Sequence, residues 1–572
     1  MNEQVRRKVV ILGLDGATFD LLGPWIEEGR LPSLKAMVAG GIRGELESCV
    51  PPVTAPAWTS FMTGKNPGKH GIFDFVTQDK NYQFHPVNSR LRHGKTLWEV
   101  IGDQGGRVVV LNVPMTHPPD PVNGALISDF LLATGRGGIS FPPELLGEIE
   151  GRFGPYCSDV VMPYFMMSQA EEDISRFILE YKQAVEYKFQ VTHYLLDRFD
   201  PDFLMLHLYG NDQITHWLWH IFDSTHPRYR KEESERHFEG IFEYYRAFDD
   251  EVGKLLRRIG EDVSLFIVSD HGMGPVYKAL DFNTWLYDEG YLVLKDRPVT
   301  KLRRLVWKAG LTPNSIAVQN WFTKGLVKLT SRVFRDQSRG AVDRLKWVHS
   351  LGHLLLSFND VDWSQTKAFS PFGFGQIRIN VRGQWAQGCV SPGPQYHQLK
   401  QEIVKKLRAL RDPETGEAVD GSILTKEEVY QGKFCDHAPD IFFVPIHGKY
   451  RPNQNNGFTS NKVISDFWGM TGIHKMNGIL IATGRHLNRG RWIEGAQLID
   501  IFPSVLYLMG MAIPNDVDGR ILHQIFADEF LHPYSTQFID EPKRSDQQSA
   551  EPRKQEEEQE VIRRLKGLGY LE

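Results

Sequence analysis

Seven side chains in this sequence have the types and the spacing needed to hold metal ions around a nucleophile. In chain order they are Asp15, Thr54, Asp212, His216, Asp270, His271 and His474. Carboxylate and imidazole groups suit Zn²⁺ or Mn²⁺ better than Mg²⁺ or Cu(I). Two such ions about 3.5–4 Å apart can clamp the attacking and leaving oxygens of a displacement at phosphorus. We therefore expect two divalent ions, zinc first and manganese as the alternative.

Thr54 is the expected nucleophile of this displacement. It lies in the segment 51–58, Pro-Pro-Val-Thr-Ala-Pro-Ala-Trp, where the prolines favour a turn and the following residues favour a helix start. A hydroxyl on a divalent metal has a lowered pKa and becomes a nucleophile at neutral pH. A threonine at a helix start is more often only an N-cap. The catalytic role therefore depends on the other six residues.

The elements that must position these residues are short buried strands, expected at 9–14, 107–113, 203–208 and 263–269. Asp15 ends the first of them, and Asp270 with His271 ends the last. Asp212 and His216 follow the third strand at a spacing of four, which places both side chains on one helical face. Ligands of open α/β sheets bind at the carboxyl ends of the strands, so each group points to the same rim.

The chain divides into four parts by pattern. Strands alternating with amphipathic stretches such as 174–198 indicate an α/β core with a mainly parallel sheet in residues 1–275. We interpret residues 276–465 as an inserted cap or lid and residues 466–540 as the closing part of the core, with further strands at 441–444 and 478–482. Residues 541–572 are expected to form a polar linker, 541–559, and a C-terminal helix, 560–568.

Composition excludes several classes of protein. The net charge of −5 over 572 residues gives no overall attraction to nucleic acid, and the four separated cysteines form no zinc knuckle or disulfide scaffold. The apolar run after Lys8 is too short for a signal peptide, and the run 502–513 is about half the length of a membrane span. We expect a soluble cytoplasmic protein that acts on a small phosphorylated substrate and reads no nucleic acid sequence; its oligomeric state stays open.

Residues 291–350 are locally basic, with 13 Lys or Arg and 3 Asp or Glu. Four aromatic residues lie among these charges: Trp307, Trp321, Phe322 and Phe334. Such a stretch is often a solvated helical face. It could also be a lid over an anionic substrate, or a site of peripheral contact with an anionic membrane. The sequence leaves these three interpretations open.

Several motifs together resemble the alkaline phosphatase superfamily and, within it, the type I phosphodiesterase/nucleotide pyrophosphatase family. They are Leu-Gly-Leu-Asp-Gly at 12–16, the Thr54 segment with Thr-Gly-Lys-Asn-Pro-Gly-Lys-His-Gly-Ile at 63–72, Ser-Asp-His-Gly-Met at 269–273, Gly-Ile-His at 472–474, Leu-Ile-Asp-Ile-Phe-Pro at 498–503 and Asp-Val-Asp-Gly at 516–519. The resemblance implies a three-layer α/β/α core. It also implies that Asp212, His216 and His474 bind one metal, and that Asp15, Asp270, His271 and Thr54 bind the other.

Two departures from related enzymes bear on the activity. Diesterases of the family place an asparagine that helps to bind the phosphoryl oxygens where this chain has Phe75. Asn112, at the end of another expected strand, is the candidate substrate-binding residue in its place. A sulfatase of the superfamily would need Cys or Ser in a CxPxR-like segment, whereas this chain has Thr54 and no arginine there.

The resemblance therefore implies a metal-dependent hydrolase of phosphodiester or nucleotide pyrophosphate bonds that works through a covalent threonine intermediate. A phosphomonoesterase or a phosphomutase-like phosphotransferase on the same site is the alternative among enzymes. The alternative outside enzymes is a metal-stabilised binding protein that uses the basic cap.

Overall fold

A nine-stranded sheet organises the molecule. The structure, a computed structural model, describes residues 7–129, 138–157, 171–312, 355–453, 457–467, 469–531, 536–540 and 555–567. The strand order is β20-β2-β19-β9-β1-β8-β5-β6-β7. The strands are β1 (Lys8–Leu14), β2 (Ile42–Glu47), β5 (Val108–Leu111), β6 (Gly124–Ile127), β7 (Ser140–Phe141), β8 (Phe203–Leu208), β9 (Val263–Val268), β19 (Asn477–Thr483) and β20 (Arg491–Gln497). Within this sheet β19 and β7 run against the others, so the sheet is mainly parallel, as the sequence predicts.

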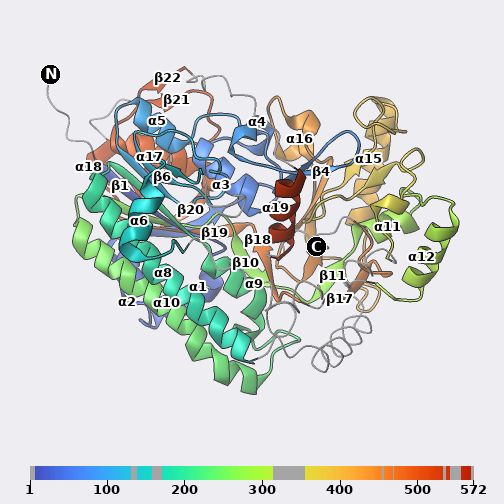
Figure 1. Cartoon of the computed structure of the whole chain (residues 1–572), viewed down its shortest axis with the longest axis horizontal. Coiled ribbons are helices and arrows are strands. Elements are labelled where there is room, and N and C mark those ends of the chain that lie inside the picture. The colour runs from blue at the N-terminus through green and yellow to red at the C-terminus, as the bar shows by residue number, and fades with distance from the viewer. Residues whose placement is uncertain are drawn as a thin grey trace.

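Helices cover both faces of this sheet (Figure 1). One layer contains α1 (Phe19–Glu27), α2 (Pro32–Gly40), α8 (Glu171–Phe199), α9 (Gly210–Phe222) and α10 (Lys231–Ile259). The other contains α3 (Thr54–Thr63), α4 (Pro67–His70), α5 (Leu97–Asp103) and α17 (Ile501–Met509). In the first layer α10 packs on α8 and α2, and in the second α17 packs on α3, α5 and β1. The predicted three-layer α/β/α core is confirmed.

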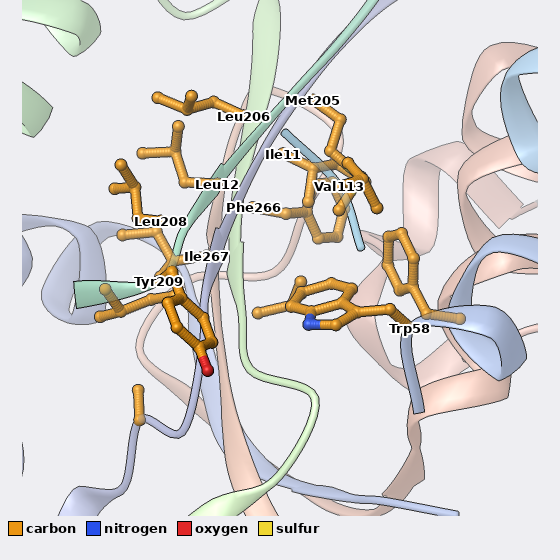
Figure 2. Close-up of a cluster of buried hydrophobic side chains, with 14 of the residues drawn as sticks. Ile11, Leu12, Trp58, Val113, Met205, Leu206, Leu208, Tyr209, Phe266 and Ile267 are labelled. Atoms are coloured by element: carbon orange, nitrogen blue, oxygen red, sulfur yellow. The ribbon is translucent and has the colours of Figure 1, made fainter. Parts of the chain in front are cut away.

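The core shows why the strands read as almost continuous apolar runs. Register pairs Ile11 with Met205 and Phe266 across β1, β8 and β9, and it pairs Leu12 with Leu206 and Ile267. Figure 2 shows the two sets on opposite faces of the sheet, with Trp58 of α3 on the side of Ile11. Because helices bury both faces, both sets are apolar.

A second hydrophobic cluster gathers residues from 280 to 464 together with Tyr82. Its helices are α11 (Phe282–Asp288), α12 (Pro298–Lys308) and α15 (Pro394–Arg408), whereas α16 (Lys426–Val429) packs on a third, smaller cluster through Val429. Its strands are β11 (Lys278–Leu280), β12 (Ala368–Phe369), β13 (Arg378–Ile379), β14 (Gly421–Thr425), β15 (Ile441–Pro445), β16 (Tyr450–Pro452) and β17 (Ile464–Asp466). The expected strand at 441–444 forms as β15 but pairs with β14, outside the main sheet. The division of the chain into core and cap stays a prediction.

The C-terminal helix begins earlier than the sequence indicates. α19 runs from Gln555 to Gly567, so residues 555–559 are helical rather than part of the expected linker, whose residues 541–554 lie outside the described residues. Val561 and Leu565 are fully buried, and α19 contacts β4 (Phe84–Pro86). Within the described ranges no helix is both long enough and apolar enough to cross a bilayer.

Candidate metal centre

The carboxyl ends of three adjacent parallel strands carry five of the predicted site residues. β9, β1 and β8 are neighbours in the sheet. Asp15 follows β1 directly, and Asp270 and His271 follow β9. Asp212 and His216 lie in the first two turns of α9, which begins two residues after β8. The three strand ends therefore bring these five side chains to one rim, as their sequence positions predict.

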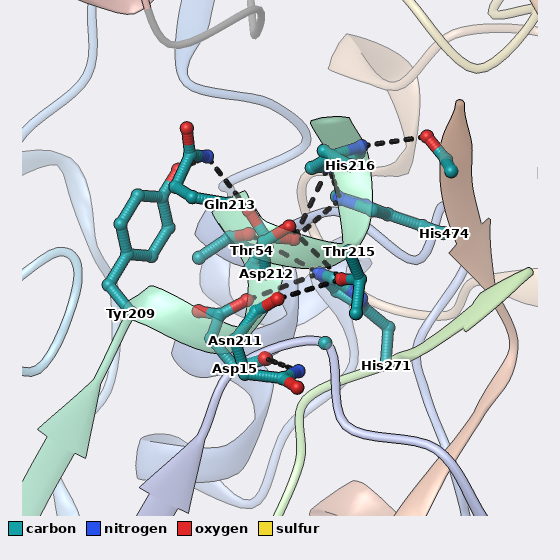
Figure 3. A network of polar contacts seen from close by, with 12 residues as sticks. Asp15, Thr54, Tyr209, Asn211, Asp212, Gln213, Thr215, His216, His271 and His474 are labelled. Carbon is teal, nitrogen blue, oxygen red and sulfur yellow. Dashed lines mark hydrogen bonds and ion pairs between the residues drawn. The ribbon is translucent and has the colours of Figure 1, made fainter. Parts of the chain in front are cut away.

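The other two residues come from distant parts of the chain. His474 lies in β18 (Gly472–Lys475), which pairs antiparallel with β10 (Gly272–Pro275) so that His474 is opposite Met273. Thr54 is the first residue of α3, with Val53 as the extended N-cap. Figure 3 shows both side chains directed toward the groups on the strand ends. The structure thus brings all seven residues together.

Two glycines allow this close approach. A Cβ on Gly13 would lie 2.6 Å from the indole of Trp58, so only glycine lets Trp58 pack against this turn of β1. Gly16 has a φ of 66°, and a Cβ there would lie 3.2 Å from the Cα of Asp212. The positive φ of Gly16 is a second, independent reason for glycine there, because residues with a Cβ rarely adopt this left-handed conformation. The Gly-Leu-Asp-Gly motif therefore shapes the floor under Asp15.

The first group of possible ligands is Asp212, His216 and His474. One donor atom of each lies within 4.8 Å of the others, and all three residues are buried. The Oδ1 atom of Asp212 is 3.3 Å from His216 Nε2 and 3.2 Å from His474 Nε2. The two Nε2 atoms lie 2.8 Å from each other.

The second group is Asp15, Asp270 and His271, again with donor atoms within 4.8 Å of one another. His271 Nε2 lies 3.5 Å from Asp15 Oδ1 and 3.2 Å from Asp270 Oδ2. It also lies 3.4 Å from the Oγ1 of Thr54. All four side chains are fully buried, so the hydroxyl of Thr54 lies beside the second group.

The three histidines are fixed in one tautomer by backbone carbonyls. His216 Nδ1 donates to the carbonyl of Gly472 at 2.9 Å, and His474 Nδ1 donates to that of Pro52 at 2.8 Å. His271 Nδ1 donates to the carbonyl of Gly272 at 3.1 Å. Because carbonyls only accept, each Nδ1 carries a proton, so that the ring in its neutral form turns the lone pair of Nε2 into the site. Metal-binding histidines are held in this way.

The resulting donor set needs a cation. In neutral His216 and His474 two lone pairs face each other at 2.8 Å, and a cation between them resolves the conflict. Burial lowers the pKa of His474, so that a proton between the two Nε2 atoms is less favourable than a metal cation. Burial and the charges of Asp15 and Asp212 raise the pKa of Asp270 well above its usual value, and its Oδ2 has no hydrogen-bond partner among the described residues. The residues therefore fit divalent metals.

Four further residues support this arrangement and were not predicted from the sequence. His207 Nε2 donates to Asp15 Oδ2 at 2.8 Å, and Trp58 Nε1 donates to the same oxygen at 3.0 Å. Asn211 Nδ2 donates to the backbone carbonyl of Asp15 at 2.6 Å. The ring of Phe374, which lies between β12 and β13 in the chain and belongs to the main core, is 5.1 Å from that of His474. A histidine within the apolar run Phe-Leu-Met-Leu-His-Leu was the available signal for His207.

Asn112, the predicted substrate contact, lies at the end of β5. Its side-chain oxygen accepts a hydrogen bond from the hydroxyl of Tyr156 at 2.7 Å, and its backbone has a φ of 58°. Its Nδ2 is buried and has no hydrogen-bond partner among the described residues. β5 is separated from β1 by β8. A contact of Asn112 with substrate stays a prediction.

The basic stretch is described only as far as residue 312. α12 packs through Trp307, whose Nε1 donates to the carbonyl of Ser460 at 2.9 Å. Figure 1 places this helix at the outer edge of the molecule, away from β1 and β18. Helix α12 therefore does not bring its charge to the rim of the site, so that, of the three interpretations, a lid formed by this helix is disfavoured. Residues 313–350, with Trp321, Phe322 and Phe334, lie outside the described residues.

Phe75, which stands where related diesterases have an asparagine, is next to a buried carboxyl group, that of Asp74. Phe75 is fully buried, and its backbone N–H donates to Asp74 Oδ1 at 2.7 Å. Gln376 Nε2 donates to Asp74 Oδ2 at 2.8 Å, whereas Gln376 Oε1 has no hydrogen-bond partner among the described residues. Burial raises the pKa of Asp74 from 3.8 to about 7. A protonated Asp74 would donate to the flipped amide of Gln376.

We expect Asp74→Asn to raise stability above neutral pH. The folded carboxyl keeps its proton between pH 3.8 and about 7, where the unfolded chain has lost it. Stability is therefore lost as pH rises through this window, by on the order of 4 kcal/mol, and Asn removes the loss. Thermal melts across the window test this, with exposed Asp250→Asn on α10 as control. An equal change in melting temperature at both ends of the window would contradict it.

Comparison with known proteins places the chain in a family. The model of the type I phosphodiesterase/nucleotide pyrophosphatase family matches residues 9–325. No curated protein matches the sequence.

Three similar solved structures are remote from this chain in sequence. Phosphonoacetate hydrolase from Sinorhizobium meliloti 1021, in complex with phosphonoformate, is 14% identical with a TM-score of 0.48, over 88% of this chain and 95% of that chain. Human ectonucleotide pyrophosphatase/phosphodiesterase 5 is 12% identical with a TM-score of 0.44, over 88% and 96%. The murine protein, in complex with AMP, is 11% identical with a TM-score of 0.45, over 88% and 96%.

The family match covers more than half of the 572 residues and includes six of the seven site residues, all but His474. It agrees with the motifs that carry the resemblance. The chain therefore belongs to the type I phosphodiesterase/nucleotide pyrophosphatase family.

Proposed function

We propose that this protein hydrolyses phosphodiester or nucleotide pyrophosphate bonds through a covalent intermediate on Thr54. The observation that supports this most is the convergence of three buried Nε2 lone pairs and three buried carboxyl groups beside one hydroxyl. Buried charge of this kind is costly unless cations complete it. Family membership supplies the class of reaction.

The two groups of side chains would hold two divalent ions. Asp212, His216 and His474 would hold one. Asp15, Asp270, His271 and the hydroxyl of Thr54 would hold the other. When bound, such ions lower the pKa of a hydroxyl and neutralise charge on phosphoryl oxygens. Zinc fits the imidazole and carboxylate donors best, with manganese as the alternative.

The start of helix α3 would favour attack by Thr54. As the first residue of α3 it carries a backbone N–H at the positive end of the helix dipole, and the N–H of Ala55 follows. These groups favour a phosphoryl group next to the hydroxyl. Oγ1 would form a bond to phosphorus while the bond from phosphorus to the leaving oxygen breaks. Water would then cleave the Oγ1–P bond and restore Thr54.

Supporting side chains keep the acceptors in place. Trp58 and His207 both donate to Asp15 Oδ2, which leaves Oδ1 directed toward His271. Gln213 Nε2 donates to Asp212 Oδ2 at 3.1 Å, which similarly leaves Oδ1 for His216 and His474. Each carboxylate is thus anchored through one oxygen and offers the other to the site, the arrangement that metal ligands need.

A panel of paired substrates tests the reaction class. The zinc- or manganese-reconstituted protein is assayed on aryl monoesters and diesters, nucleotide diphosphates and glycerophosphodiesters, with Thr54→Ala as the blank for contaminating hydrolases. We expect kcat/KM to favour the diesters and pyrophosphates.

A preference for monoesters of about a hundredfold, some 2.7 kcal/mol in transition-state binding, would overturn the diesterase assignment. It would leave the monoesterase or phosphotransferase alternative, with Phe75 as the first residue to examine. No hydrolysis of any ester by metal-loaded protein would favour the metal-stabilised binding protein.

A further inference from the structure

Helix α12 (Pro298–Lys308) and the turn after it expose apolar side chains that nothing in the described structure covers. The exposed fractions are 50% for Val299, 56% for Leu302, 63% for Leu305 and 45% for Leu311. The other large apolar side chains exposed among the described residues are spread over the chain: Leu91, Leu179, Ile446, Trp492, Phe538 and Ile539. The segment 299–311 is therefore a local concentration of exposed apolar surface.

The exposed side chains are not the packing face of the helix. Val299, Leu302 and Leu305 recur every three residues and lie on one side. The opposite side is already held by Thr300, whose Oγ1 donates to Asp360 Oδ1 at 2.8 Å, and by buried Trp307. The helix is thus anchored to the protein through one face and presents leucines on another.

The inner side of α12 is well ordered by several contacts. Arg303 pairs with the carboxylate of Asp360 at 3.0 Å. The ring of Trp307 packs edge-on against Tyr287 at 5.6 Å and Phe458 at 5.7 Å. A helix fixed in this way holds its outer face in a constant orientation, so a docking surface is prepared before any partner arrives.

Positive charges border the apolar face. Lys301 and Lys308 are exposed and lie four residues before and three residues after Leu305, at one border of the apolar face, and α12 itself contains no acidic residue. The acidic groups facing these cations are Asp296, which pairs with Lys301 at 2.6 Å, and Asp288, which interacts with Lys308. The border keeps a positive balance, since Lys295 and Arg297 lie beside Asp296.

We propose that α12 lies in the surface of an anionic lipid bilayer, with Leu302 and Leu305 inserted at the boundary of head groups and acyl chains. A helix with an apolar face bordered by Lys and Arg binds such surfaces through the combination of buried apolar area and attraction to anionic lipid. A protein partner would need a separate acidic group opposite each bordering cation, whereas an anionic membrane offers negative charge to all of them. Figure 1 shows α12 at the outer edge of the molecule, where a flat surface can reach it.

The proposal is independent of the hydrolase activity and is tested by binding alone. The full-length protein is sedimented with vesicles of phosphatidylcholine and with vesicles of phosphatidylcholine mixed with phosphatidylglycerol, at low and at moderate salt. We expect binding to the mixed vesicles that weakens with salt, because screening shortens the reach of the charges. Failure of wild-type protein to bind mixed vesicles at low salt would overturn the proposal.

Variants separate the two contributions. Leu302→Gln with Leu305→Gln should weaken binding about tenfold or more, and Lys301→Gln with Lys308→Gln about 30-fold at low salt. Leu179→Gln, an equally exposed leucine (51%) on α8, is the matched control and should bind as the wild type does.

Melting temperature and ester turnover should stay unchanged in all of these variants, since the substituted side chains are on the surface and away from the site. Wild-type binding by the double leucine variant would contradict the proposal. A second result would also contradict it: the wild-type protein does not bind vesicles but forms a dimer that the leucine changes dissociate. In that case the apolar face would dock on a second copy of the chain.

Discussion

Replacing Thr54 with alanine is expected to abolish ester hydrolysis while leaving the fold and the metal content intact. The hydroxyl is the only group at the start of α3 that could form a bond to phosphorus, and its loss should lower kcat by on the order of 10⁴-fold or more. Metal content should persist because six ligands remain. Steady-state kinetics and elemental analysis of the same preparation measure both quantities.

Two variants serve as controls for this substitution. Thr59→Ala removes a buried threonine of the same helix, whose Oγ1 donates to the carbonyl of Ala55 at 2.7 Å and does not face the site. It should keep most of the wild-type turnover. Thr54→Ser keeps a nucleophilic hydroxyl and should recover part of the activity. Wild-type turnover by Thr54→Ala would rule out the covalent mechanism.

Asp270→Asn is expected to lower the metal content. It is also expected to melt at or above the wild-type temperature without metal, and below it with metal. Removing this ligand should weaken metal binding at the second group by more than the 10–100-fold that is typical when a residue supporting a ligand is changed. The metal content should therefore fall from two ions per chain to about one. Without metal the variant should melt at or above the wild-type temperature, because it removes a buried acid crowded by Asp15 and Asp212. With saturating zinc the wild type should melt higher, because binding stabilises the folded state.

Inductively coupled plasma mass spectrometry and calorimetry with and without chelator measure these effects. Asp74→Asn is the matched control, since it replaces a buried carboxyl that belongs to neither group. Its metal content should equal that of the wild type. Two ions per chain in Asp270→Asn, or a chelator that leaves the wild-type melting temperature unchanged, would contradict the two-ion assignment.

The sequence predicted the part of the fold that repeats a simple pattern. Strand β8 begins and ends at the predicted residues, and β1, β5 and β9 agree to within two residues at each end, because buried parallel strands read as short apolar runs. The order of the groups after these strands then placed five site residues at one rim. The family's motifs supplied Thr54 and His474, which no periodicity could have linked to them.

Other features escaped prediction for physical reasons. Strands β12 and β13 have two residues each, and β14 and β15 have five, so pairing within the second cluster leaves little periodic signal. β15 reads like a strand of the main sheet but pairs with β14. Trp58 was an ordinary aromatic residue in sequence, and its hydrogen bond to Asp15 depends on the absence of a side chain at Gly13.

The short pairing between β10 and β18 has a consequence for the order of folding. It joins His474 to residues that are synthesised far earlier, since His216 and His474 are 258 residues apart in sequence and the carbonyl that orients His474 belongs to Pro52, 422 residues before it. Closing so long a loop is slow, because its entropy is lost before any contact compensates it. During synthesis Asp15, Asp270 and His271 can assemble first, whereas the first group stays incomplete until β18 has emerged. With metals bound as proposed, full loading would be a late event, and it would distinguish a finished chain from one that stopped short of residue 474.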